Sequence, residues 1–265
     1  MAETEVGLQA ITDVVVPPGR VLGIDQSSWQ DNSTTPFMPN WEMAKSAGAE
    51  FAYIRMMYPG VDGKPAIDRQ WIYNWHHARE NMLCGAYVVY MYWSAGVQLQ
   101  MDVLKGIFKN GYTGDLPIAI DFEHVAKYGD IPARKNWLPN LEKYILFLET
   151  LTKKPVVIYT NPDIIKTHLT PVYESTILSR CPLWVADYRG RIEPELYKQF
   201  SKWTLYQFSD RLDGKKFGCE SLQVDGNYFQ GTIDDLYRWA GLLPPIPVVT
   251  LEERVAVLEA WVKAH

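Results

Sequence analysis

Short apolar runs alternate with longer amphipathic stretches from Val21 onward, and this alternation constrains the fold more than any other feature. Eight runs have the length and composition of buried strands and cover residues 21–27, 51–57, 84–93, 116–123, 155–160, 182–188, 204–210 and 223–229. Helical spacing fills the early gaps at 40–48, 68–82, 96–110 and 135–152, and returns at 232–241. Strands that alternate with helices build a parallel sheet. The chain of 265 residues is therefore predicted to be α/β, an irregular TIM-like (β/α) barrel with about five β/α units plus three further strands.

The two ends of the chain differ from this middle part. Residues 1–20 are interpreted as an N-terminal extension and residues 21–243 as the barrel domain. The proline-rich segment 244–250 predicts a stiff linker. A C-terminal helix is expected at 251–265, where a heptad pattern places Leu251, Val255, Leu258 and Val262 on one stripe. A heptad pattern this short more often belongs to a helix that packs on its own domain, and a homo-oligomer formed through this helix is the less favoured possibility.

Composition and charge argue against several classes of protein. The net charge of −5 leaves no basic surface for nucleic acid. No run of 18 apolar residues occurs, so no membrane insertion is expected. The N-terminus lacks the basic and apolar regions of a signal peptide, which predicts synthesis in a reducing cytoplasm. Cys84, Cys181 and Cys219 lack the spacing of a zinc site or a disulfide framework, and no cofactor or metal is expected.

Acidic residues gather where the predicted strands end, which in a barrel is the mouth that carries the chemistry. Asp25 ends the first strand, Asp121 and Glu123 end the fourth, and Asp225 lies near the last. Because side chains alternate along a strand, Asp121 and Glu123 share a face, with their Cα atoms roughly 7 Å apart. Ala119 lies below them on that face, and a small residue there suits the narrow inside of a barrel. These acids are therefore expected to converge on one mouth.

Two carboxyl groups this close do not ionise independently, so one keeps its proton to higher pH and is an acid poised beside a base. A solvated strand end or a magnesium site would also explain clustered acids. However, the motifs G-x-x-x-x-G-K-[ST], H-E-x-x-H and G-x-S-x-G are all absent, and His76 and His77 lie in mid-helix. Carboxylates with flanking aromatic residues are typical of glycosidases.

The motifs of this chain resemble those of the glycoside hydrolase family 25 lysozymes, which are muramidases common among phage endolysins and bacterial autolysins. The resemblance spans residues 21 to 240. "GIDQSSWQ" matches the family's D-x-S-x-x-Q, "PIAIDFEH" its D-x-E and "LWVADY" its W-x-A-x-Y. "VVIYTNP" also matches, and "LYQFSD" and "VDGNYF" match the closing Q-[YF]-S and V-D-x-N-x-F. The motifs occur along the chain in the same order as in the family.

The resemblance implies an enzyme that cleaves the β-1,4 bond between N-acetylmuramic acid and N-acetylglucosamine in bacterial peptidoglycan. By position, Glu123 would be the general acid, and Asp121 would orient the substrate's acetamido group or attack directly. Asp25 and Asp225 would complete the acidic floor. An endolysin-like protein would reach the wall after a holin-like exit or lysis. Eight residues are candidates for lining a glycan groove: Tyr53, Tyr87, Tyr92, Trp93, Tyr159, Trp184, Tyr188 and Gln207. A position in the core is an equally good explanation for any single aromatic residue among them.

Two segments depart from the family pattern. The second strand ends in "IRMMYPG", where the family usually has a K/R-A-T-E-G type of ending, and the third reads "YVVYMYW" in place of a His–Phe ending. Both lie at the expected mouth, so the details of substrate choice are open. The alternatives are a non-catalytic peptidoglycan-binding or phage tail module, which the intact Asp121 and Glu123 disfavour, and a chitinase-like hydrolase. Chitinase motifs carry extra acids where this chain has Ile118 and Ala119.

Overall fold

The computed structural model describes residues 10–31, 39–93, 97–109, 111–170, 175, 177–197 and 200–243. The linker and helix expected at 244–265 and the first part of the N-terminal extension lie outside the described residues. Within the described part, no helix has the length and apolar character needed to cross a membrane.

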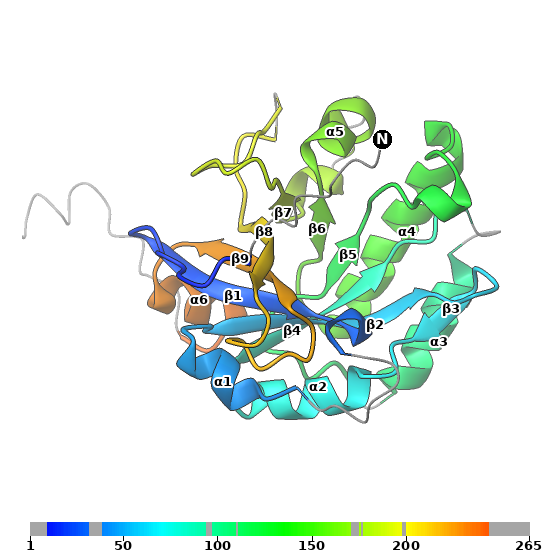
Figure 1. Ribbon diagram of the computed structural model, residues 1–265. Helices are drawn as coiled ribbons and strands as arrows, with labels where there is room; N and C mark the ends of the chain where they lie inside the picture. Colours follow the sequence, from blue (N-terminus) through cyan, green and yellow to red (C-terminus); the bar gives the residue numbers. More distant parts are fainter. Residues whose placement is uncertain are drawn as a thin grey trace, which may run out of the picture.

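Eight strands close into a barrel, and a further short strand, β3, pairs with the end of β2 (Figure 1). The sheet order is β1-β9-β8-β7-β6-β5-β4-β2-β3, and an additional β1–β2 pairing closes the ring. The strands are β1 Arg20–Gln26, β2 Phe51–Pro59, β3 Pro65–Ile67, β4 Leu83–Val89, β5 Ala119–Asp121, β6 Val157–Thr160, β7 Leu183–Ala186, β8 Leu205–Asp213 and β9 Gln223–Gln230. This arrangement confirms the predicted barrel with five β/α units and three further strands, while the short β3 was not predicted.

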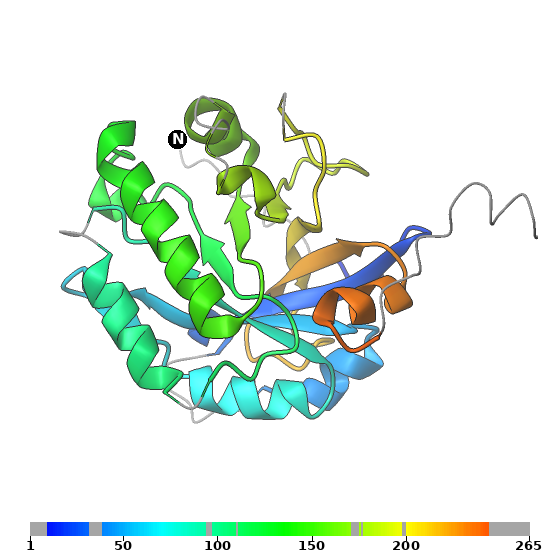
Figure 2. The same cartoon turned by 180° about the vertical axis from the view of Figure 1, so that it is seen from behind.

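Helices cover the outside of the barrel and one of its ends (Figures 1 and 2). They are α1 Trp41–Ser46, α2 Trp71–Arg79, α3 Gln98–Ile107, α4 Arg134–Thr152, α5 Pro162–Ile164 and α6 Ile233–Ala240. Single turns of other helix types lie at η1 Ser28–Gln30, η2 Ala126–Tyr128, η3 Ile165–Leu169 and η5 Leu178–Arg180. Local signals set some of their ends. The side chains of Thr232 and Asp235 form a capping box at the start of α6, and Gly241 ends that helix in the left-handed conformation.

The last strand does not run parallel to the others. β9 pairs antiparallel with both β8 and β1, whereas β1 with β2, and β4 through β8, pair in parallel. The parallel pairing that strand–helix alternation predicts therefore does not extend to β9. The physical reason is the connection 214–222, which is shorter than the dozen or so residues that a parallel crossover requires.

Two apolar clusters separate the inside of the barrel from its helix-covered outside. The inner cluster takes alternate residues from the strands, including Val21, Ala119 and Trp184, while their neighbours Leu22 and Ile120 pack against the helices. Leu236 and Ala240 of α6 belong to the inner cluster. Lys154, which precedes β6, donates a 2.7 Å hydrogen bond to the Ala240 carbonyl. Helix α6 therefore closes the end of the barrel where the parallel strands begin, and the opposite mouth stays open.

Candidate active site

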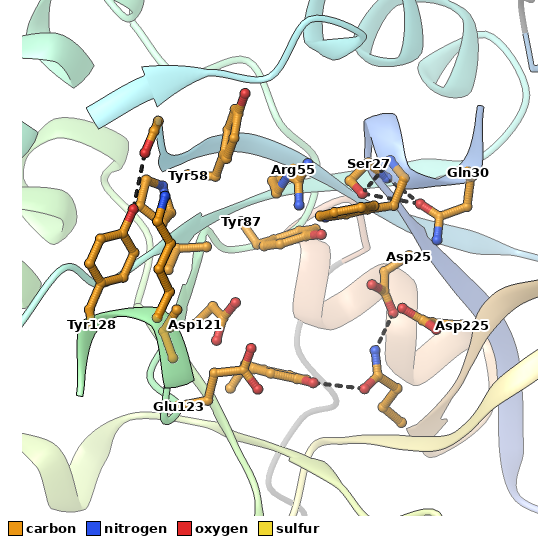
Figure 3. Close-up of a pocket in the computed structure, with 18 of the residues that line it drawn as sticks. Asp25, Ser27, Gln30, Arg55, Tyr58, Tyr87, Asp121, Glu123, Tyr128 and Asp225 are labelled. Carbon is orange, nitrogen blue, oxygen red and sulfur yellow. Dashed lines mark hydrogen bonds between the residues drawn. The ribbon is translucent and has the colours of Figure 1, made fainter. Parts of the chain in front are cut away.

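All four predicted acids line one cavity of about 700 Å³ at the open mouth. Asp25 comes from β1, Asp121 ends β5, and Glu123 follows two residues later. Asp225 lies inside β9, directly opposite Asp25 in the register. Because β9 is antiparallel, its beginning reaches the same mouth as the ends of the parallel strands. Figure 3 shows Asp25 beside Asp225, and Asp121 beside Glu123.

Asp25 sits in a cradle of amide donors. Its Oδ2 accepts hydrogen bonds from Gln207 Nε2 at 2.7 Å and from Asn227 Nδ2 at 2.8 Å. Burial raises the pKa of Asp25, and these two bonds offset part of that rise. Burial and the neighbouring Asp25 charge raise the pKa of Asp225 well above its usual range. Asp225 is therefore the member of this pair that keeps its proton and shares it with Asp25.

The two amides of the cradle are themselves oriented by aromatic residues. Gln207 Oε1 accepts hydrogen bonds from the hydroxyl groups of Tyr159, at 2.8 Å, and Tyr188. Asn227 Oδ1 accepts a 2.8 Å bond from Trp184 Nε1. Since both carbonyl oxygens are engaged in this way, both NH₂ groups are directed at Asp25.

Burial also dominates the second acid pair, Asp121 and Glu123. Burial raises the pKa of Asp121 well above its usual range, and the charges of Glu123 and Asp25 raise it further. Burial and then Asp25 also raise the pKa of Glu123, whereas His124 lowers it. Asp121 Oδ1 is buried and accepts no hydrogen bond from any described residue. The site therefore holds a proton on a carboxyl group at pH values where a free glutamate would have lost it, and it offers one unused acceptor beside that proton.

Arg55 balances part of this negative charge, although sequence reasoning did not select it. Its side chain forms a buried ion pair with Asp68, with Nη2 to Oδ2 at 2.7 Å, and stacks on the Tyr58 ring at 4.6 Å. The guanidinium charge lowers the pKa values of Asp25 and Asp121 against the effect of burial. The signal available in the sequence was a lone cation near the end of the second predicted strand.

The structure divides the predicted groove residues into two sets. Tyr87, Tyr159, Trp184 and Gln207 line the cavity. The other four do not line this cavity: Tyr53, Tyr92, Trp93 and Tyr188.

Each of these four side chains is committed elsewhere. Tyr53 is fully buried in the barrel, where its hydroxyl donates to the Pro117 carbonyl at 3.0 Å. Tyr92 and Trp93 lie beyond the end of β4, because that strand stops at Val89 instead of reaching Trp93. Tyr188 is 41% exposed, and its hydroxyl is bonded to Gln207.

Several lining residues come from loops that strand periodicity could not rank. Trp29, in the turn η1, is 78% exposed at the cavity and is held there by the Ser27–Gln30 capping box. Val61 and Tyr128 also line the cavity from loops, and Tyr58 lines it from the end of β2. Among the described residues, no group of three or more histidine, cysteine or acidic side chains has the arrangement of a metal site.

The sequence matches a known protein family over most of its length. The family model of glycosyl hydrolases family 25 matches residues 24–216, which include three of the four acids and stop before Asp225. Lysozyme M1 of Streptomyces globisporus is 28% identical over 221 residues, which is 80% of this chain and 68% of that protein.

Solved structures show the same fold. A bacterial lysozyme from Streptomyces coelicolor superposes with a TM-score of 0.65 at 25% identity, covering 84% of this chain and 98% of its own. A family 25 glycosyl hydrolase from Bacillus anthracis gives a TM-score of 0.70 at 20% identity, covering 88% of this chain and 100% of its own.

Proposed function

Since this chain belongs to glycosyl hydrolase family 25, it is a glycoside hydrolase with lysozyme activity on peptidoglycan, and we propose that Glu123 is its general acid. The bond cleaved is the β-1,4 linkage from N-acetylmuramic acid to N-acetylglucosamine. The observation that carries the assignment is a carboxyl group that lines the cavity and whose pKa is raised by burial and by Asp25. Such a group still holds a proton when the substrate binds, and it can pass that proton to the leaving oxygen.

Asp121 is proposed to act on the acetamido group of the muramic acid and not as the nucleophile. Its pKa is raised well above the usual range, which disfavours the ionised form that direct attack needs. Its buried Oδ1 has no donor among the described residues, so the acetamido N–H can supply the missing hydrogen bond. With the N–H held, the acetamido oxygen attacks C1 as the glycosidic bond breaks, and water later attacks C1 with Glu123 as the base. This route retains configuration.

Asp25 and Asp225 are proposed to form the charged floor under the reacting sugar. The amide cradle keeps Asp25 oriented, and an anion there stabilises the positive charge that develops at C1 in the transition state. The negative charge of Asp25 also keeps the proton on Glu123. One buried pair thus acts on both the sugar and the acid.

The chemical identity of the new reducing ends tests this function. Purified cell walls are digested, the fragments are reduced with borohydride, and the reduced sugar is identified by mass spectrometry after acid hydrolysis. Reduced muramic acid is the expected product. Reduced glucosamine, or new amino termini without any new reducing sugar, would contradict the proposed bond.

A further inference from the structure

The end of β2, which departs from the family pattern, meets the turn η2 at one side of the cavity. The second departing segment follows β4, and its Trp93 packs against the same turn. Figure 3 shows Tyr58 of β2 and Tyr128 of η2 on the same side of the acids. We refer to residues 58–61 and 125–128 as the rim.

Side chains from one segment bind successive carbonyl groups of the other. Tyr128 OH donates to the Gly60 carbonyl at 3.0 Å, and Lys127 Nζ donates to the Val61 carbonyl at 3.2 Å. The Trp93 ring stacks on Tyr128 with centroids 4.0 Å apart and planes at 10°. Trp93 Nε1 also lies 3.4 Å from the Gly63 carbonyl, to which it donates. Hydrogen bonds and ring stacking therefore hold the two segments of the rim together.

The rim differs in chemistry from the floor of the cavity. Seven of its residues line the cavity and none of them is acidic: Tyr58, Pro59, Gly60, Val61, Val125, Lys127 and Tyr128. Val61 is 95% exposed, so its apolar side chain makes almost no contact with the protein. Lys127 is exposed, and its ammonium group is held toward the cavity side by the Val61 carbonyl. The rim thus offers an apolar surface with one positive charge, next to four carboxyl groups.

This chemistry fits a sugar ring poorly. One face of the Tyr128 ring is covered by Trp93, and Arg55 lies over the Tyr58 ring. The Tyr128 hydroxyl is already donated to Gly60. Sugar hydroxyl groups would therefore find few polar partners here. Methyl groups and a carboxylate, by contrast, would find both an apolar surface and an ammonium group.

We propose that the rim binds the lactyl-peptide substituent on O3 of the muramic acid. This inference rests on the proposed function, because only muramic acid carries that group in a glycan strand. The methyl groups of the lactyl unit and the first alanine contact Val61 and Pro59. A carboxylate of the substituent pairs with Lys127. The carboxylate comes from the stem peptide, or from the lactyl group itself where the peptide has been removed.

Binding to a catalytically silent protein tests the rim separately from the chemistry. Glu123→Gln is the background, and calorimetry measures Kd for three ligands of equal length. These are a peptide-bearing glycan strand, the same strand after an amidase has removed the peptides, and an oligomer of N-acetylglucosamine. Lys127→Met removes the charge and keeps the stem, Lys127→Arg restores the charge, and Val61→Asp adds a repelling charge at an exposed position. Lys64→Ala is the matched control, because Lys64 pairs with Asp62 on the same turn and does not line the cavity.

The expected result is that Lys127→Met weakens binding of the peptide-bearing strand about fivefold more than binding of the N-acetylglucosamine oligomer, as one partly exposed charge pair can do. Val61→Asp should act in the same direction, and Lys127→Arg and Lys64→Ala should match the background protein. A loss on the peptide-bearing strand alone would assign the pairing to a carboxylate of the peptide. A loss on the amidase-treated strand as well would show that Lys127 also pairs with the lactyl carboxylate that the amidase frees. Equal effects on all three ligands, or none, would overturn the inference. Cleavage of a glycan ligand by the Glu123→Gln background would instead contradict the proposed function.

Discussion

Replacing Arg55 by methionine should destabilise the protein through the carboxylate that it leaves behind. The side chains of Arg55 and Asp68 are 9% and 1% exposed, and Arg55 Nε and Nη2 lie 2.8 and 2.7 Å from Asp68 Oδ2. Without Arg55, Asp68 is a buried charge with no counter-ion. Removing one partner of such a pair costs about 3–5 kcal/mol. Asp68 keeps hydrogen bonds from the backbone N–H groups of Ser28 and Gln70, so the expected loss is about 3 kcal/mol, the lower end of that range.

The double variant Arg55→Met/Asp68→Asn separates the lost charge pair from the lost packing. An asparagine oxygen can still accept from one of the two N–H groups, and no charge remains buried. The double variant should therefore be more stable than the single one, by at least about 1 kcal/mol. Urea unfolding followed by tryptophan fluorescence measures both, with equal m-values as the check that the same transition is compared. A single variant that loses less than about 1 kcal/mol, or a double variant that is the less stable of the two, would refute this account of the pair.

The same substitution has a consequence for activity. The Arg55 charge lowers the pKa values of Asp25 and Asp121. Without it, both carboxyl groups keep their protons to higher pH, so the acidic limb of the kcat/KM profile should move to higher pH in both variants. An unmoved acidic limb would mean that neither aspartate needs to ionise.

Two further substitutions test the acidic floor and the packing below it. Asp225→Asn should become more stable relative to wild type as the pH rises from about 4 to about 7. Burial and Asp25 raise the folded-state pKa of Asp225 above its unfolded value, so the wild type loses stability over this range and a neutral amide does not. The same difference in unfolding free energy between the two proteins at both ends of the range would speak against this. In Gly85→Ala, a new Cβ would lie 2.5 Å from the ring of the fully buried Tyr53, so a loss of about 1–3 kcal/mol is expected. Gly106→Ala on α3, where no atom lies within 4 Å, is the control and should be neutral or stabilising by up to about 1 kcal/mol; equal effects at both glycines would refute the packing argument.

Local periodicity explains what could be predicted from the sequence. Alternation along the fourth predicted strand correctly placed Ala119 inside the barrel, and it placed Asp121 and Glu123 on the same face at the mouth. The direction of β9 depends on the length of a loop and not on periodicity, so the way in which Asp225 reaches the mouth was missed.

Contacts between distant loops were not predictable in the same way. The rim forms because Tyr128 meets Gly60 and Trp93 meets Gly63, pairs that no short-range pattern relates. Trp93 looked like a strand residue because its neighbours are apolar and aromatic, although β4 ends at Val89. Arg55 was overlooked since its importance lies in its ion pair with Asp68, a residue of the following loop.

The role of Glu123 as proton donor is tested most directly by changing how much the leaving group needs a proton. Glu123→Gln is compared with wild type on purified peptidoglycan and on an aryl glycoside of the muramic-acid-containing disaccharide. Asp130→Asn is the control, because Asp130 is fully exposed and contacts the site only through His124. The expected loss on peptidoglycan is about 10²- to 10⁴-fold, with a much smaller loss on the aryl glycoside, whose leaving group departs without protonation. Undiminished cleavage of peptidoglycan, or an equal loss on both substrates, would contradict the assignment of Glu123 as the general acid.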